Sequence, residues 1–188
     1  MTVTPRPIAW ITTINNEGLV NVAPFSFFTC LSSHPPLIGV TIMNRKGHPK
    51  DTLQNIMDRG EFVINVVTED NLKACNLTSI EAPRTFSEAE YAHLALSPSK
   101  TISVPRLQDS PIHLECCLNT VIPFGADDQA EHPTHFVVGE VLQFGIKDHV
   151  LKDGNIVPST LRAVGRLSGP LYSTTELFLK LKRPQWSE

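Results

Sequence analysis

Six short runs of apolar, β-branched and aromatic residues constrain the fold of this 188-residue chain more than any other feature. In residues 7–14, Ile8, Trp10 and Ile14 fall on one face of an extended strand, as the two-residue period of a β-strand requires. The turn signal Asn-Asn-Glu-Gly follows at residues 15–18, so the first two runs are expected to pair as a β-hairpin. The six predicted strands span residues 7–14, 19–23, 37–42, 62–67, 112–122 and 136–146.

Helical patterns are few and short, and they are expected at residues 51–59, 69–75 and 175–181. The first has Asp51 as a candidate N-cap, Gln54 three residues later to complete a capping box, and Gly60 as a stop. Strands and helices do not alternate regularly, which argues against a doubly wound parallel sheet. The pattern predicts a mainly β fold, a closed or partly closed antiparallel barrel with short helices.

Length, charge and hydropathy exclude several classes of protein. The length suits one domain over residues 1–188, and a formal net charge of −3 argues against a nucleic-acid-binding protein. No apolar span of about 20 residues is present, so no membrane helix is expected. Residues 1–7 lack an apolar signal core, which favours a cytoplasmic location. The spacing of the four cysteines fits neither a zinc site nor a disulfide scaffold.

Residues 79–110 interrupt the strand pattern with prolines at positions 83, 98 and 105. A segment of this length without clear secondary structure is typical of a functional loop or a partner contact. We therefore expect it to run over the surface and to shape the substrate side of any site.

A basic loop precedes the first predicted helix and is a candidate anion site. Arg45, Lys46 and Lys50 place three cations within six positions, and Gly47 and Pro49 favour a turn between them. The helix that follows offers unpaired backbone N–H groups and the positive end of its dipole. A phosphate there would gain charge-assisted hydrogen bonds.

Asp51 complicates this interpretation, because its carboxylate could cap the same N–H groups. The phosphate would then lie beside the helix end, on Lys50, Arg45 and the hydroxyl of Thr52. A solvated basic loop leading into an ordinary helix cap is the alternative.

A second segment, residues 26–33, alternates hydroxyl and apolar side chains and suits a flat ring. An isoalloxazine ring has an apolar end, which phenylalanines can contact, and a polar end, which hydroxyls and backbone groups can bind. The alternative is a strand that lines the core. The candidate ring contacts are Ser26, Phe27, Phe28, Thr29, Cys30 and Ser32.

Other catalytic and metal-binding patterns are weak. An acidic, histidine-containing cluster lacks the rigid spacing of a metal site, so no metal is predicted. The sequence contains neither a Gly-x-Ser-x-Gly elbow nor a Gly-x-Gly-x-x-Gly motif after a strand. The cluster consists of Asp127, Asp128, Glu131, His132 and His135.

Several segments, taken in order, give the chain a family resemblance over nearly its whole length. It resembles the flavin reductase-like family with the FMN-binding split barrel, in the longer form that includes flavoredoxin-type proteins and reductase components of two-component monooxygenases. The matching segments are residues 5–10, 21–26, 33–37, 50–55, 60–65, 110–115, 139–141 and 165–167.

The resemblance implies a six-stranded antiparallel split barrel that binds FMN non-covalently as a homodimer. It places the ring contacts on residues 26–32 and the phosphate contacts on residues 45–52, and it brings residues 165–172 near the flavin or the dimer interface. The implied phosphate contacts are Arg45, Lys50, Asp51 and Thr52.

The resemblance also implies an NAD(P)H-dependent reductase in which a nicotinamide passes hydride to flavin N5. Electrons then pass to oxygen, free flavin, a metal complex or a partner oxygenase. No catalytic acid or base is expected, because the flavin carries the chemistry. An electron carrier reduced by a protein partner, a flavin oxidase of a specific small molecule, and an interaction module without cofactor are the alternatives.

Overall fold

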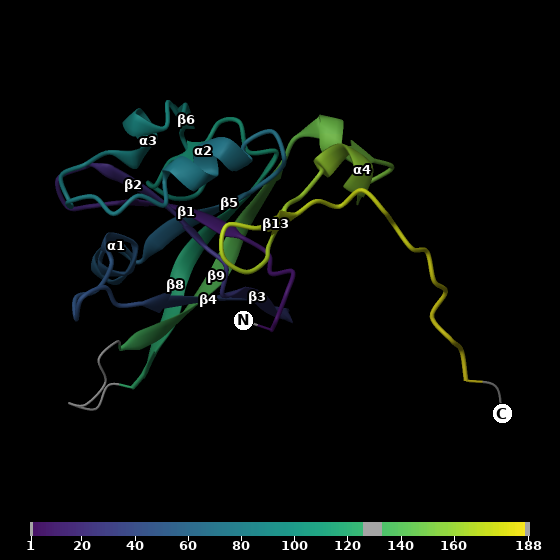
Figure 1. Cartoon of the computed structure of the whole chain (residues 1–188), viewed down its shortest axis with the longest axis horizontal. Coiled ribbons are helices and arrows are strands. Elements are labelled where there is room, and N and C mark those ends of the chain that lie inside the picture. Colours follow the sequence, from purple (N-terminus) through teal and green to yellow (C-terminus); the bar gives the residue numbers. More distant parts are fainter. Residues whose placement is uncertain (1, 126–132, 187–188) are drawn as a thin grey trace.

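The computed structural model describes residues 2–125 and 133–186, and a seven-stranded antiparallel sheet forms its centre (Figure 1). The strand order is β2-β1-β5-β8-β9-β4-β3, so strands from both halves of the chain lie side by side. The strands of this sheet are β1 Ala9–Ile14, β2 Val20–Phe25, β3 Phe28–Ser33, β4 Pro36–Met43, β5 Glu61–Val66, β8 Ile112–Phe124 and β9 Thr134–Ile146.

The six predicted strands are all present, and the mainly β, split-barrel fold is confirmed. The predicted strand number was wrong by one, because residues 28–33 form a seventh strand. This strand pairs with β4 from Phe28 opposite Val40 onward, with a bulge between Cys30 and Ser32. Five of its six residues are exposed, so this strand has no buried apolar face of the kind that identified the other six in the sequence.

The first helix, α1, spans Asp51–Arg59 as predicted, and Gly60 ends it with a left-handed φ of 71°. The predicted capping box is wrong. Lys50 is the N-cap residue and no side chain caps the helix, while the Gln54 amide donates to Asp58 instead.

The remaining elements are short. The second helix begins three residues later than predicted, and two four-residue helices were not expected at all. These elements are α2 Leu72–Leu77, α3 Glu88–Tyr91, α4 Pro158–Leu161, the 3-10 helix Asp148–Val150, and the short strands β6 Leu96–Ser97, β7 Arg106–Leu107, β10 Leu151–Lys152, β11 Asn155–Ile156, β12 Gly165–Arg166 and β13 Tyr172–Ser173. No helix in the described ranges is long and apolar enough to cross a membrane.

The helix predicted at residues 175–181 is wrong. Residues 174–186 form an extended C-terminal arm that runs away from the body (Figure 1). A helix of seven residues is marginal without a packing partner, and the three leucines of this segment are almost fully exposed.

Two buried clusters hold the sheet. The first fills the barrel, where Leu53 and Ile56 of α1 pack against sheet residues such as Phe62 and Ile64. The second lies on the other side of β1, around Trp10, and includes residues of the 79–110 segment. That segment is therefore packed onto the sheet, and it forms one wall of the site described next.

Candidate cofactor site

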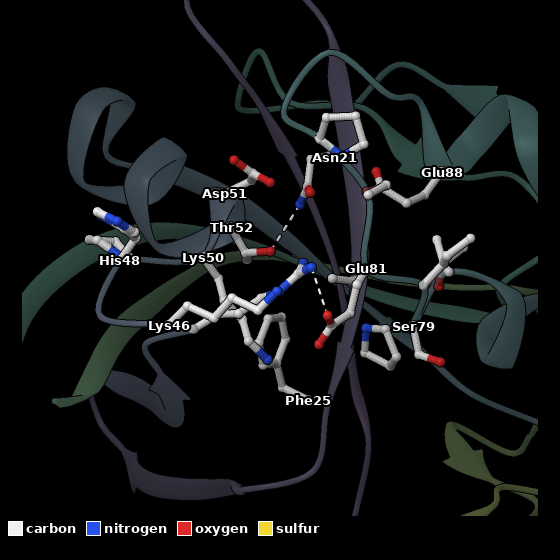
Figure 2. Close-up of a pocket in the computed structure, with 18 residues that line it drawn as sticks. Asn21, Phe25, Lys46, His48, Lys50, Asp51, Thr52, Ser79, Glu81 and Glu88 are labelled. Atoms are coloured by element: carbon white, nitrogen blue, oxygen red, sulfur yellow. Dashed lines mark hydrogen bonds and ion pairs between the residues drawn. The ribbon is translucent and has the colours of Figure 1, made fainter. Parts of the chain in front are cut away.

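A cavity of about 620 Å³ lies between the basic loop, the end of β2 and residues 78–83 of the long segment (Figure 2). A second cavity of about 410 Å³ adjoins it. Both are lined by Pro24, Phe25 and Lys50, so the end of β2 separates two parts of one larger site.

The basic loop is a tight turn fixed by its own backbone. Arg45 and His48 exchange backbone hydrogen bonds of 2.8 and 2.9 Å. Lys46 and Gly47 both adopt positive φ angles, 50° and 79°, and glycine accepts this conformation without strain. The turn brings Arg45 and Lys50, which flank it, to the same cavity.

Lys50 is half-buried, and its ammonium lies 5.6 Å from the centre of the Phe25 ring. Burial lowers the pKa of Lys50, the Arg45 guanidinium lowers it further, and the Glu81 carboxylate opposes both. An anion placed between two neighbouring cations stabilises the charged form of each. The geometry thus favours a phosphate or a similar anion at this end.

Glu81 supplies a carboxylate to this end of the site. Its Oε2 lies 2.7 Å from a guanidinium nitrogen of Arg45, and the dashed line at Glu81 in Figure 2 marks this ion pair. Glu81 belongs to the 79–110 segment, so that segment supplies a protein anion to the cation from the basic loop.

Asp51 does not cap its own helix. Its carboxylate accepts a hydrogen bond of 3.2 Å from Arg84, which also donates to Asn55 at 2.8 Å. The first turn of α1 therefore has no side-chain cap, and the conflict between Asp51 and a bound anion does not arise. Thr52 is buried, and its hydroxyl accepts a hydrogen bond of 2.9 Å from Asn21.

The second cavity is built around Arg6, a buried arginine that the sequence did not identify as a site residue. Its guanidinium donates to Ser26 Oγ at 3.3 Å and to the Leu167 carbonyl at 2.9 Å. It also lies 5.8 Å from the centre of the Phe27 ring. Arg6 therefore joins the predicted ring segment to the 165–169 loop, and four residues of that loop, 166–169, line the same cavity.

The structure brings some predicted residues together and leaves others apart. Ser26 and Phe27 share the second cavity with Lys50, whereas Arg45, Asp51 and Thr52 line the first. The other predicted ring residues lie in β3, outside both cavities, and their contact with a ring stays a prediction. Phe28 packs against the barrel core, and the exposed residues are Thr29, Cys30 and Ser32.

Glu88 is a further cavity residue that no sequence pattern indicated. It is buried in α3, accepts a hydrogen bond of 3.3 Å from the Val22 backbone N–H, and lines the first cavity. Burial raises the pKa of Glu88. Near Glu88 the sequence indicates only that Ser87 can cap a short helix, and a helix cap does not indicate that Glu88 lines a cavity.

The acidic, histidine-containing cluster cannot be located in the structure. All its members except His135 fall within residues 126–132, which lie outside the described residues. His135 lies in β9 opposite Ile42. Within the described ranges, no three His, Cys, Asp or Glu residues are grouped to hold a metal ion.

Comparison with known proteins gives consistent matches. The family model for the flavin reductase like domain matches residues 1–165. Nitrilotriacetate monooxygenase component B from Bacillus cereus superimposes with a TM-score of 0.91 at 33% identity, covering 96% of this chain and 89% of that one. The 2-nitrobenzoate 2-nitroreductase NbaA from Pseudomonas fluorescens gives 0.85 at 34% identity, covering 97% and 87%. A Shewanella frigidimarina protein with a split barrel domain gives 0.82 at 24% identity, covering 95% and 86%.

Proposed function

Because the chain belongs to the family of flavin reductase-like domains, we propose that it is an oxidoreductase that binds FMN non-covalently in the two cavities around Phe25. The single observation that carries the proposal is the pair of cations at one end of this site, Lys50 and Arg45. The adjoining cavity contains an aromatic ring and a hydroxyl, Phe27 and Ser26, beside the guanidinium groups of Arg6 and Arg166. We also propose that residues 1–188 act as one functional domain.

The side chains fit the chemical groups of FMN. A phosphate monoester carries between one and two negative charges at neutral pH, and Lys50 and Arg45 would hold it with charge-assisted hydrogen bonds. The ring would lie toward Ser26 and Phe27, where Arg6 fixes the position of the Ser26 hydroxyl. Arg45 would exchange its partner Glu81 for the phosphate.

When bound, FMN would supply the hydride and electron-transfer chemistry, with NADH or NADPH as the proposed hydride donor. The protein's own residues bind and orient the cofactor. None is assigned as a general acid or base. A monooxygenase component among the similar structures supports an oxygenase or another electron-accepting protein as partner.

Direct reduction of a small molecule is a second candidate function. The similarity to a nitroreductase at 34% identity favours it over a flavin oxidase. A carrier that takes electrons from a protein partner remains the non-reductase alternative.

We further propose a homodimer, supported by an apolar face of the sheet. Directly opposed residues of an antiparallel pair share one face, and Met43 and Phe124 both lie opposite Thr134. Ile122 lies on that face too, and Leu31 of β3 adjoins it at Gly39. We call these four side chains, Leu31, Met43, Ile122 and Phe124, the outer face; each is more than two-fifths exposed.

The visible spectrum of the purified protein tests the central proposal. We expect an oxidised-flavin spectrum, either as isolated or after addition of FMN. Anaerobic mixing with NADH and NADPH should then bleach it. A colourless protein that takes up no FMN would overturn the proposed function, and a flavin that neither nucleotide reduces would favour the carrier. Nitrobenzoate added to the reduced protein tests the second candidate.

A further inference from the structure

We infer that the C-terminal arm, residues 174–186, binds a second copy of this chain along the free edge of its β3 strand. The inference rests on the homodimer proposed above. The last hydrogen bond from this end to the body runs from Thr175 Oγ1 to the Ala163 carbonyl, at 3.1 Å. From residue 176 to Trp186, no hydrogen bond or ion pair joins the arm to any described residue, and Figure 1 shows it leaving the body.

The arm has the pattern of a strand that lacks its sheet. Leu177, Leu179 and Leu181 are 94%, 92% and 89% exposed, and they alternate with Phe178 and with lysines. In an extended chain these three leucines share one side. Apolar side chains gathered on one side of a free segment mark a contact surface.

The two edges of the sheet differ in what they offer such a strand. At β2, Pro24 has no N–H, and the Val22 N–H already donates to Glu88 of the covering helix α3. At β3, five of six residues are exposed, and the strand contains neither proline nor lysine; the bulge between Cys30 and Ser32 is the edge-protecting feature that it does have. The β3 edge therefore suits strand addition.

The length and surroundings of β3 also match the arm. Residues 176–182 number seven, and β3 has six residues. Leu31 of β3 belongs to the outer face, so an added strand would place its leucines next to the apolar side chains of the proposed dimer interface.

A second copy, rather than the same chain, is the occupant that the structure favours. Within one copy, Leu177, Leu179 and Leu181 are almost fully exposed, although β3 and the outer face of that same copy are exposed too. Exchange between two copies is reciprocal, so a twofold dimer would cover both arms and both β3 edges and leave no open contact.

A cross-link at the native Cys30 tests the inference. Cys30 is exposed in β3, whereas Cys75 and Cys116 are buried and burial raises the pKa of both thiols. We expect the variant Lys180→Cys, treated with oxidised glutathione, to form a disulfide-linked dimer on a non-reducing gel. Adding Cys30→Ser should abolish that band.

The matched control is Glu17→Cys, which places a thiol at another exposed position, in the β1–β2 turn. This control variant should form little disulfide-linked dimer under the same oxidation. An intrachain disulfide that runs as a monomer, or a dimer band independent of Cys30, would overturn the inference. FMN content measured on the same samples separates the two proposals, since a cross-linked dimer without flavin would sink only the proposed cofactor.

Sedimentation provides a second test that needs no cysteine. Replacing Leu177, Leu179 and Leu181 by serine should raise the dimer dissociation constant by roughly tenfold or more, because three apolar side chains lose their burial. The control replaces Lys180, Lys182 and Arg183 by serine and should change it much less. Equal effects of the two triple variants would contradict strand addition through the leucines.

Discussion

The two ends of the candidate site are built in different ways. The anion end comes from one short stretch, in which a turn between Arg45 and His48 and the start of α1 fix both cations. The ring end is assembled by Arg6, which donates to Ser26, 20 positions away in the sequence, and to Leu167, 161 positions away. The proposed phosphate contacts therefore depend on neighbours in the sequence, whereas the proposed ring contacts depend on residues that are far apart in the sequence.

The substitution with the largest expected effect removes the half-buried cation of the anion end. Lys50→Ala should weaken FMN roughly 10- to 100-fold, since a hydrogen bond to a charged group contributes about 1.5–3 kcal/mol. Riboflavin, which lacks the phosphate, should lose little affinity. Fluorescence titrations with both ligands measure this difference.

A control for net charge is Lys152→Ala, an exposed lysine on β10 away from the site. It should leave both affinities nearly unchanged. Equal losses of FMN and riboflavin in Lys50→Ala would contradict the phosphate assignment.

At the ring end we expect a substitution to weaken FMN and riboflavin without discriminating between them. Arg6→Ala removes the link between Ser26 and Leu167, so FMN and riboflavin should weaken by the same factor, roughly three- to tenfold. Arg162→Ala, which removes an exposed arginine paired with Glu69 and Asp70, is the control and should affect neither ligand. A loss confined to FMN would place Arg6 at the phosphate instead.

The difference between local and long-range contacts also explains which features could be predicted from the sequence. The bounds of α1 and the basic loop follow from an amphipathic run, a glycine stop and clustered cations, which are all local signals. The hydrogen-bond partner of Asp51 does not follow from local signals, because Arg84 lies 33 positions away in the sequence. Likewise β3 is recognisable as a strand only through its pairing with β4.

A smaller effect is expected from pH. Burial and Arg45 lower the pKa of Lys50 below 10.5, so its ammonium is fully present at low pH and is lost earlier than usual as pH rises. FMN affinity should therefore fall several-fold more than riboflavin affinity between about pH 7 and about pH 9.5. Lys50→Arg should remove this difference, because arginine stays charged. Parallel curves for the two ligands in the native protein would argue against Lys50 at the phosphate.

The smallest effect concerns the carboxylate that pairs with Arg45. Glu81→Gln removes a charge that competes with phosphate for the guanidinium, but Glu81 is exposed and Arg45 is partly exposed, and such pairs contribute only about 0–1 kcal/mol. FMN should bind about two- to fivefold more tightly, with riboflavin unchanged. The matched control is Glu17→Gln, an exposed carboxylate in the β1–β2 turn. Weaker FMN binding in Glu81→Gln would mean that Glu81 holds the cation in place for the phosphate rather than competing with it.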